Sequence, residues 1–84
     1  MKFCYITFRS VTFAQRGERL LKKKGIRCDL RRTPKWMEEQ GCGYSLRLRE
    51  EDAGAAAALL SGAGVPLRKL YCQRPDGKLE EMTP

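Results

Sequence analysis

The feature that most constrains the fold of this chain is a pattern that occurs twice: a strand-like segment, a helical segment and a second strand-like segment. Alternation of apolar and polar residues is typical of a strand with one buried face, and it covers residues 26–31 and 44–49. Residues 2–8 also predict a strand, with Cys4, Ile6 and Phe8 on one face and Phe3, Tyr5 and Thr7 on the other. A fourth strand is predicted at residues 67–72, after Pro66. The residues predicted to face inward in the first three strands are Cys4, Ile6 and Phe8, then Ile26, Cys28 and Leu30, then Tyr44, Leu46 and Leu48.

Each half also contains one predicted helix with a glycine stop. Ser10 or Thr12 can cap the first helix, and the acidic residues 50–52 favour the N-terminus of the second. The predicted stops are Gly25 for the first helix and Gly62 and Gly64 for the second. Apolar residues at spacings of three and four predict the buried stripes, which are Phe13, Ala14, Gly17, Leu20 and Leu21 in the first helix and Ala55, Ala56, Leu59, Leu60 and Ala63 in the second.

Two strand-helix-strand halves of similar length predict an α+β fold of ferredoxin-like β-α-β-β-α-β order, with two helices on one face of a four-stranded antiparallel sheet. A chain of 84 residues suits a single domain, here residues 1–84, with a core at 1–72 and a tail at 73–84. The turn sequence Pro75-Asp76-Gly77 indicates that residues 78–82 return as a short extra strand.

The net charge of +7 is unevenly distributed along the chain. Up to Lys35 there are eleven basic and two acidic residues, whereas the remainder has six basic and eight acidic residues. This asymmetry indicates an anionic partner, either nucleic acid bound weakly and without sequence specificity or an acidic protein surface. The alternative is that the lysines and arginines form a solvated helix face.

The sequence favours a cytoplasmic protein without a membrane partner. It contains no apolar run of about eighteen residues, and its start, MKFCYITFRS, is interrupted by Arg9 too early for a secretory signal. Without an export signal, the four cysteines are expected to be thiols and not disulfides.

The residue types present do not suggest a self-sufficient active site. There is no histidine, and the cysteines at positions 4, 28, 42 and 72 include no pair two residues apart. The acidic pairs are adjacent in sequence, so their side chains point apart. We therefore expect no metal and no cofactor, and a carrier or accessory protein in place of a catalyst.

Cys42 carries most of the functional signal. Cys4 and Cys28 share the inward strand phase and are predicted to be buried and inert. Cys42 instead lies between Gly41 and Gly43, where little side-chain bulk hinders a partner. The supporting residues Arg31, Arg32 and Lys35 begin the same connection and are expected to lower the pKa of its thiol. The alternative is that Gly-Cys-Gly is only a tight turn into a strand.

Several short stretches carry a family resemblance. They are Ile6 to Ser10, Leu20-Leu21, Gly25-Ile26, Thr33-Pro34 and Cys42-Gly43 ahead of Leu46-Arg47-Leu48. In these the chain resembles the putative selenium/sulfur carrier family, a group of short bacterial proteins. The resemblance implies that Cys42 holds sulfur or selenium as a persulfide-type adduct and exchanges it with protein partners, a donor enzyme and an acceptor enzyme.

Two other functions remain open. One is a protein-interaction or homodimerisation module that uses the open sheet face or the edge of the fourth strand. The other is a weak nucleic-acid binder that uses the same open face. The residues predicted to line that face are Phe3, Tyr5, Arg27, Arg31, Ser45, Arg47 and Arg49.

Overall fold

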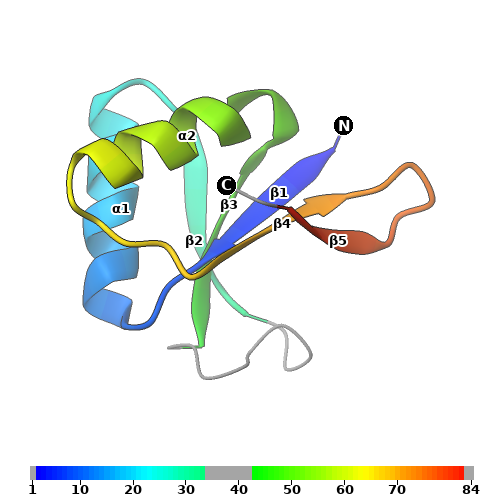
Figure 1. The fold of residues 1–84 in the computed structure, drawn as a ribbon, viewed down its shortest axis with the longest axis horizontal. Coiled ribbons are helices and arrows are strands. Elements are labelled where there is room, and N and C mark those ends of the chain that lie inside the picture. The colour runs from blue at the N-terminus through cyan, green and yellow to red at the C-terminus, as the bar shows by residue number, and fades with distance from the viewer. Residues whose placement is uncertain (1, 34–42, 83–84) are drawn as a thin grey trace.

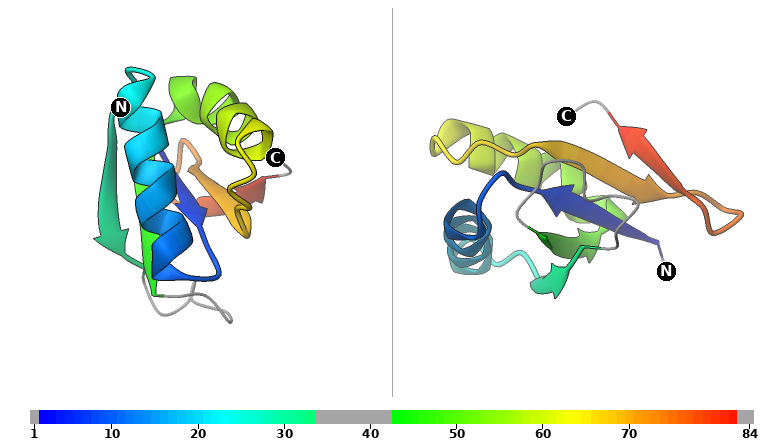
Figure 2. Two further views of the ribbon diagram at one scale, coloured as in Figure 1. Left: turned by 90° about the vertical axis from the view of Figure 1, so that its left-hand side faces the viewer. Right: turned by 90° about the horizontal axis from the view of Figure 1, so that it is seen from below.

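The computed structural model describes residues 2–33 and 43–82, which form one antiparallel sheet with two helices on one of its faces (Figures 1 and 2). The strands follow the spatial order β2-β3-β1-β4-β5. This arrangement confirms the predicted ferredoxin-like fold, with a fifth strand added at the C-terminal end. The elements are β1 (Phe3–Thr7), α1 (Val11–Lys23), β2 (Cys28–Arg32), β3 (Tyr44–Arg49), α2 (Glu50–Gly62), β4 (Lys69–Gln73) and β5 (Leu79–Met82).

The core lies between the sheet and the two helices. Cys4, Ile6 and Phe8 are fully buried, as their predicted inward phase in the first strand indicates. In β3, Leu46 and Leu48 are buried on the same face, and they pair in register with Ile6 and Cys4. β1 lies between β3 and β4, and its successive residues alternate between the two faces of the sheet. The even-numbered residues face the core and the odd-numbered residues face the opposite side.

The first helix follows the sequence prediction closely. Ser10 is the N-cap, and its Oγ accepts a hydrogen bond from the Phe13 N–H at 3.2 Å. Gly25, just past the helix end, has a φ of 82°, which a glycine adopts without strain. The buried residues are Ala14, Gly17 and Leu21, with Phe13 and Leu20 packed partly against the core.

The predicted buried face of the second helix is partly wrong. Ala55 and Ala63 are exposed, whereas Ala53 and Ala57 are buried. Ala56 and Leu60 are buried as predicted and Leu59 is half-buried. The reason is that α2 consists mainly of alanine and leucine after its acidic first turn, so hydrophobicity hardly varies around it. Periodicity identifies a buried face only where a polar face opposes it.

The C-terminal tail forms the predicted extra strand. In the turn before it, the Arg74 N–H donates to the Lys78 carbonyl at 2.7 Å, and Gly77 has a φ of 87°. β5 then pairs antiparallel with β4. This corrects one alternative: the outer edge of the fourth strand is occupied by β5 and is not free for a second copy of the chain.

Candidate functional site

The connection that contains Cys42 lies between Thr33 and Gly43, and these two flanking residues are joined by a backbone hydrogen bond. The Thr33 N–H donates to the Gly43 carbonyl at 2.8 Å, directly after the register pair of Arg32 and Tyr44. Gly43 is buried, and its φ of 84° lies in the left-handed region that favours glycine. A side chain at position 43 would therefore strain the backbone at the start of β3.

Three predicted site residues lie outside the described residues: Cys42, the hypothesised chalcogen acceptor, and its predicted neighbours Gly41 and Lys35. The two predicted supporting arginines are described, and they do not come together. Arg31 and Arg32 end β2, and both are exposed. Because adjacent residues in a strand point to opposite faces, Arg32 shares the helix-covered face with Leu30, and Arg31 lies on the other face.

The two arginines also differ in their contacts. The guanidinium carbon of Arg32 lies 5.4 Å from the centroid of the Tyr44 ring, a cation–π contact that positions this side chain beside the end of β3. Arg31 forms no ion pair or ring contact with another residue of the segments 2–33 and 43–82. Among the two, Arg31 is thus the less constrained cation.

The expectation that all four cysteines are thiols is wrong for two of them. Cys4 and Cys72 form a disulfide between β1 and β4. The two residues are direct partners in the antiparallel register, and their Cα atoms are 4.0 Å apart. Burial of the Cys4 side chain was predicted and is confirmed.

The sequence contains a signal for this pair, although composition alone does not reveal it. The two cysteines are 68 residues apart, so no local motif joins them. Both nevertheless lie on the inward face of their strands, and the predicted topology places the first strand beside the fourth. Residues 67–72 do not alternate, however, so the sequence left the face of Cys72 open and the pair was missed.

The third described cysteine, Cys28, is a buried thiol. Its side chain is 5% exposed, which confirms the prediction from strand phase. Its Sγ lies 3.9 Å from the Glu18 carbonyl oxygen, to which it donates a weak hydrogen bond. Burial raises the pKa of the Cys28 thiol, and the Glu18 carboxylate adds to the increase. Since the thiolate is the nucleophilic form, Cys28 is poorly suited to accept a transferred atom.

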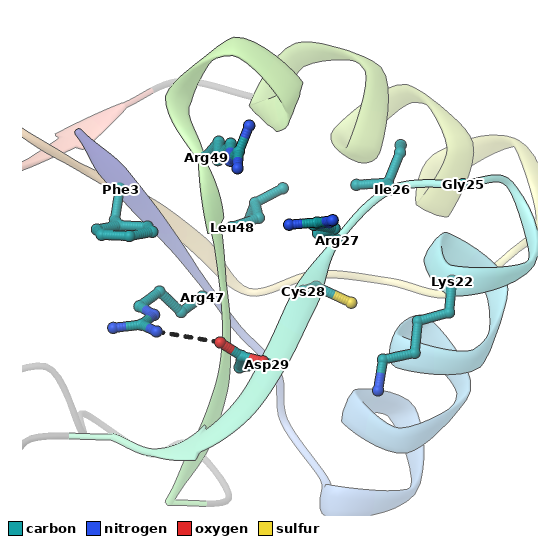
Figure 3. Close-up of a pocket in the computed structure, with 10 residues that line it drawn as sticks. All are labelled: Phe3, Lys22, Gly25, Ile26, Arg27, Cys28, Asp29, Arg47, Leu48 and Arg49. Atoms are coloured by element: carbon teal, nitrogen blue, oxygen red, sulfur yellow. Dashed lines mark hydrogen bonds and ion pairs between the residues drawn. The ribbon is translucent and has the colours of Figure 1, made fainter. Parts of the chain in front are cut away.

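A hollow lies beside Cys28, at the end of β2 remote from Arg32 (Figure 3). The Arg47 guanidinium lies 4.5 Å from the Phe3 ring centroid and forms an ion pair with Asp29 at 3.1 Å. The sulfur of Cys28 points toward α1. The lining residues are Phe3, Lys22, Gly25, Ile26, Arg27, Cys28, Asp29, Arg47, Leu48 and Arg49. Every cation of this lining except Arg27 forms an ion pair with a described carboxylate.

The described segments 2–33 and 43–82 contain neither a cluster of metal-binding residues nor a helix that could span a membrane. In these segments, histidine, cysteine, aspartate and glutamate do not gather into a group of three or more that could hold a metal ion. Neither α1 nor α2 is long and apolar enough to cross a membrane.

Comparison with known proteins identifies the family of the chain. The family described as "putative Se/S carrier protein-like" matches residues 3–72, a span that contains the two helices, the first three strands and all but the last residue of β4. The chain belongs to this family. No curated protein and no solved structure matches it.

Proposed function

We propose that this protein is a sulfur or selenium carrier that holds the atom on Cys42 as a persulfide or selenosulfide. The carrier takes the atom from a donor enzyme and releases it to an acceptor enzyme. Family membership supports this class of function, and the Gly-Cys-Gly context supports Cys42 as the carrying residue.

The observation that carries the choice of Cys42 is the state of the other three cysteines. Cys4 and Cys72 are joined to each other, so neither offers a thiolate. Cys28 is buried, and its pKa is raised. A carrier needs a free thiol that a partner enzyme can reach. The disulfide rules out Cys4 and Cys72, and burial rules out Cys28, which leaves Cys42 as the candidate.

The proposed loading step is a thiol exchange that needs no external oxidant. The Cys42 thiolate attacks the terminal sulfur of a persulfide on the donor enzyme, and a new sulfur–sulfur bond forms at Cys42. The donor's own sulfur–sulfur bond breaks, and its cysteine leaves as a thiolate with the bonding electron pair. The proton on the transferred sulfur travels with it, so atoms and charge balance. Release to the acceptor reverses these roles, with Cys42 as the leaving thiolate.

The test is the intact mass of the protein after incubation with a cysteine desulfurase and cysteine. Wild type is expected to gain the mass of one sulfur atom, and Cys42→Ser to gain none. A parallel incubation with a selenocysteine-cleaving enzyme and selenocysteine distinguishes selenium from sulfur as the preferred atom.

Cys28→Ser is the matched control, because it also removes one unpaired thiol but from a buried position. It is expected to load as wild type does, and circular dichroism establishes that both variants fold. If Cys42 reacts with small alkylating agents but gains no mass from either donor, the carrier proposal is wrong.

The supporting role proposed for Arg31, Arg32 and Lys35 has its own test. Loading should increase as pH rises through the ionisation of Cys42, because the thiolate is the attacking species. Removing a nearby positive charge should move this midpoint to higher pH. Since Arg31 and Arg32 lie on opposite faces, we expect only one of Arg31→Gln and Arg32→Gln to move it. An unchanged midpoint in both variants, and in Lys35→Gln, contradicts the supporting role.

A further inference from the structure

The outer side of α1 carries a row of cations that packing does not require. Arg16, Arg19 and Lys23 follow one another at spacings of three and four, so they share one side of the helix. Lys24 adds a further cation at the C-cap. All four side chains are exposed, and we call them the α1 basic face. The buried side of the helix contains none of these residues.

The α1 basic face is not neutralised by neighbouring carboxylates. Glu18 is the one acidic residue of the helix, and it pairs with Lys22 at 3.3 Å. None of the four residues of the face forms an ion pair with any residue in the described segments. The field of these charges is therefore directed into solvent, where it attracts an anion.

Helix stability explains only part of the row. Cations near a helix C-terminus are favoured by the helix dipole, which accounts for Lys23 and Lys24. Arg16 and Arg19 lie in the middle of the helix, outside the last turn, where that effect has faded. These two arginines are thus the residues whose charge has no structural explanation.

The chemistry of the face distinguishes between anionic partners. Protein interfaces rely on an apolar or aromatic centre, but the neighbours on this side are the polar residues Thr12 and Gln15, both exposed. The exposed large apolar residue of α1 is Val11, at its first position. Phosphate contacts need no apolar centre, since they draw on charge and counterion release.

The dimensions of the face also suit a phosphate backbone. Arg16 and Lys23 are seven residues apart, which corresponds to about 10 Å along the helix. Successive phosphates of one DNA strand advance by about 3.4 Å along the duplex axis, so this distance covers about three of them. A row of three exposed cations can follow one strand over that length.

The open sheet face is less suited to nucleic acid than the sequence suggests. Arg47 is held between Asp29 and the Phe3 ring, so neither this cation nor that face of the ring is free. Arg49 pairs with Glu51 at 3.5 Å, and Ser45 is 1% exposed. Stacking of bases needs an accessible aromatic platform with free cations around it.

We propose that the α1 basic face binds the phosphate backbone of nucleic acid without reading its bases. This binding does not depend on Cys42 and is separate from the proposed carrier function. Its signature is an affinity that falls steeply with salt and does not change with base sequence.

The test is fluorescence anisotropy with a short labelled DNA duplex, titrated at several salt concentrations. Arg16→Gln/Arg19→Gln is expected to weaken binding at low salt by at least about tenfold and to reduce the slope of log affinity against log salt by up to about 2. Glutamine keeps good helix propensity, so the helix should be preserved. Cys42→Ser should bind as wild type does.

Arg74→Gln/Lys78→Gln is the matched control, since it removes the same charge from the exposed β4–β5 turn. It should weaken binding far less than the α1 pair. Equal losses in both double variants would mean that net charge alone is responsible, and would overturn the proposal. So would a lack of binding at low salt, a dependence on base sequence, or tighter binding to a polyglutamate peptide than to the duplex. The last result would indicate an acidic protein partner.

Discussion

The two strand-helix-strand halves of this protein share an architecture but differ in how their charges are arranged. In residues 2–33, one of ten basic residues forms an ion pair with a described carboxylate, whereas four of the six in residues 43–82 do so. Exposed ion pairs contribute little to stability. The two halves therefore differ in the charge that they present to a partner. Most cations of the first half have no paired carboxylate among the described residues, whereas most cations of the second half do.

The same two halves treat equivalent cysteines differently. Cys28 and Cys72 each lie on the inward face of the strand that closes its half. β4 is next to β1, so Cys72 lies opposite Cys4 and is bridged to it. β2 is next to β3, so Cys28 lies opposite Leu48 and remains a thiol. The neighbouring strand, and not the strand itself, determines the chemistry of the sulfur.

The largest effect on stability is expected from removing the disulfide that joins β1 of the first half to β4 of the second. Cys4→Ala/Cys72→Ala should lower the free energy of unfolding by about 4 kcal/mol, because the bridge closes a loop of 68 residues in the unfolded chain. Cys28→Ala is the matched control, since it removes one buried sulfur without a bridge, and about 1 kcal/mol is expected. Urea denaturation without reductant measures both. Because the double variant removes two buried sulfurs and the control removes one, a loss only about twice that of Cys28→Ala would show that the bridge contributes nothing.

A smaller effect should distinguish the two helices: replacing a glycine by alanine should stabilise α2 but destabilise α1. A Cβ on Gly54 of α2 meets no atom within 4 Å, so Gly54→Ala should raise the free energy of unfolding by about 1 kcal/mol through helix propensity. A Cβ on Gly17 of α1 comes within 3.1 Å of both Leu60 Cδ2 and Phe8 Cζ. Overpacking then outweighs propensity, and Gly17→Ala should lower stability by about 1 kcal/mol.

The Gly17 prediction depends on contact with Leu60, which a double-mutant cycle can isolate. In a Leu60→Ala background one of the two obstructing atoms is gone and Phe8 Cζ remains, so the same Gly17→Ala change should become less harmful. Thermal or urea unfolding of the four proteins provides the coupling energy. Additive effects would indicate that the helices do not meet at Gly17.

The smallest effect concerns the free thiol of the first half. The raised pKa of Cys28 means that the folded protein keeps this proton at a pH where the unfolded thiol, with a pKa near 8.5, loses it. The contribution of Cys28 to stability is therefore fully present below about pH 8.5 and falls as pH rises further. The difference in stability between wild type and Cys28→Ala should be constant below that pH and decrease above it. A difference that stays constant up to about pH 10 would contradict the raised pKa.

Much of the fold could be predicted because local patterns agree with the tertiary arrangement. The Ser10 cap, the Gly25 stop and the inward phase of Ile6 each predict a feature that the structure contains. The buried face of α2 could not be predicted, since a helix of alanines has no polar side to orient it. Packing against the sheet made that choice, with Ala53 and Ala57 turned inward.

The site was predicted less completely, for a different reason. Strand phase placed Cys4 and Cys28 in the core, but residues 67–72 do not alternate, so the face of Cys72 stayed open and the partner of Cys4 was missed. The separation of Arg31 and Arg32 follows from the two-residue period of a strand, but it was missed because the strand was predicted to end at Arg31 and extends to Arg32. Cys42 lies outside the described residues, and its role stays a prediction.

The bridge between Cys4 and Cys72 also determines how the polypeptide responds to being cut. Between Cys4 and Cys72, the backbone and the disulfide form a closed ring that contains both helices and the strands β2 and β3. Hydrolysis of any single peptide bond in that ring, including those in the connection between Thr33 and Gly43, opens the ring without producing two molecules. A nicked protein would keep its full mass on a denaturing gel until a reductant is added, and only then separate into two fragments.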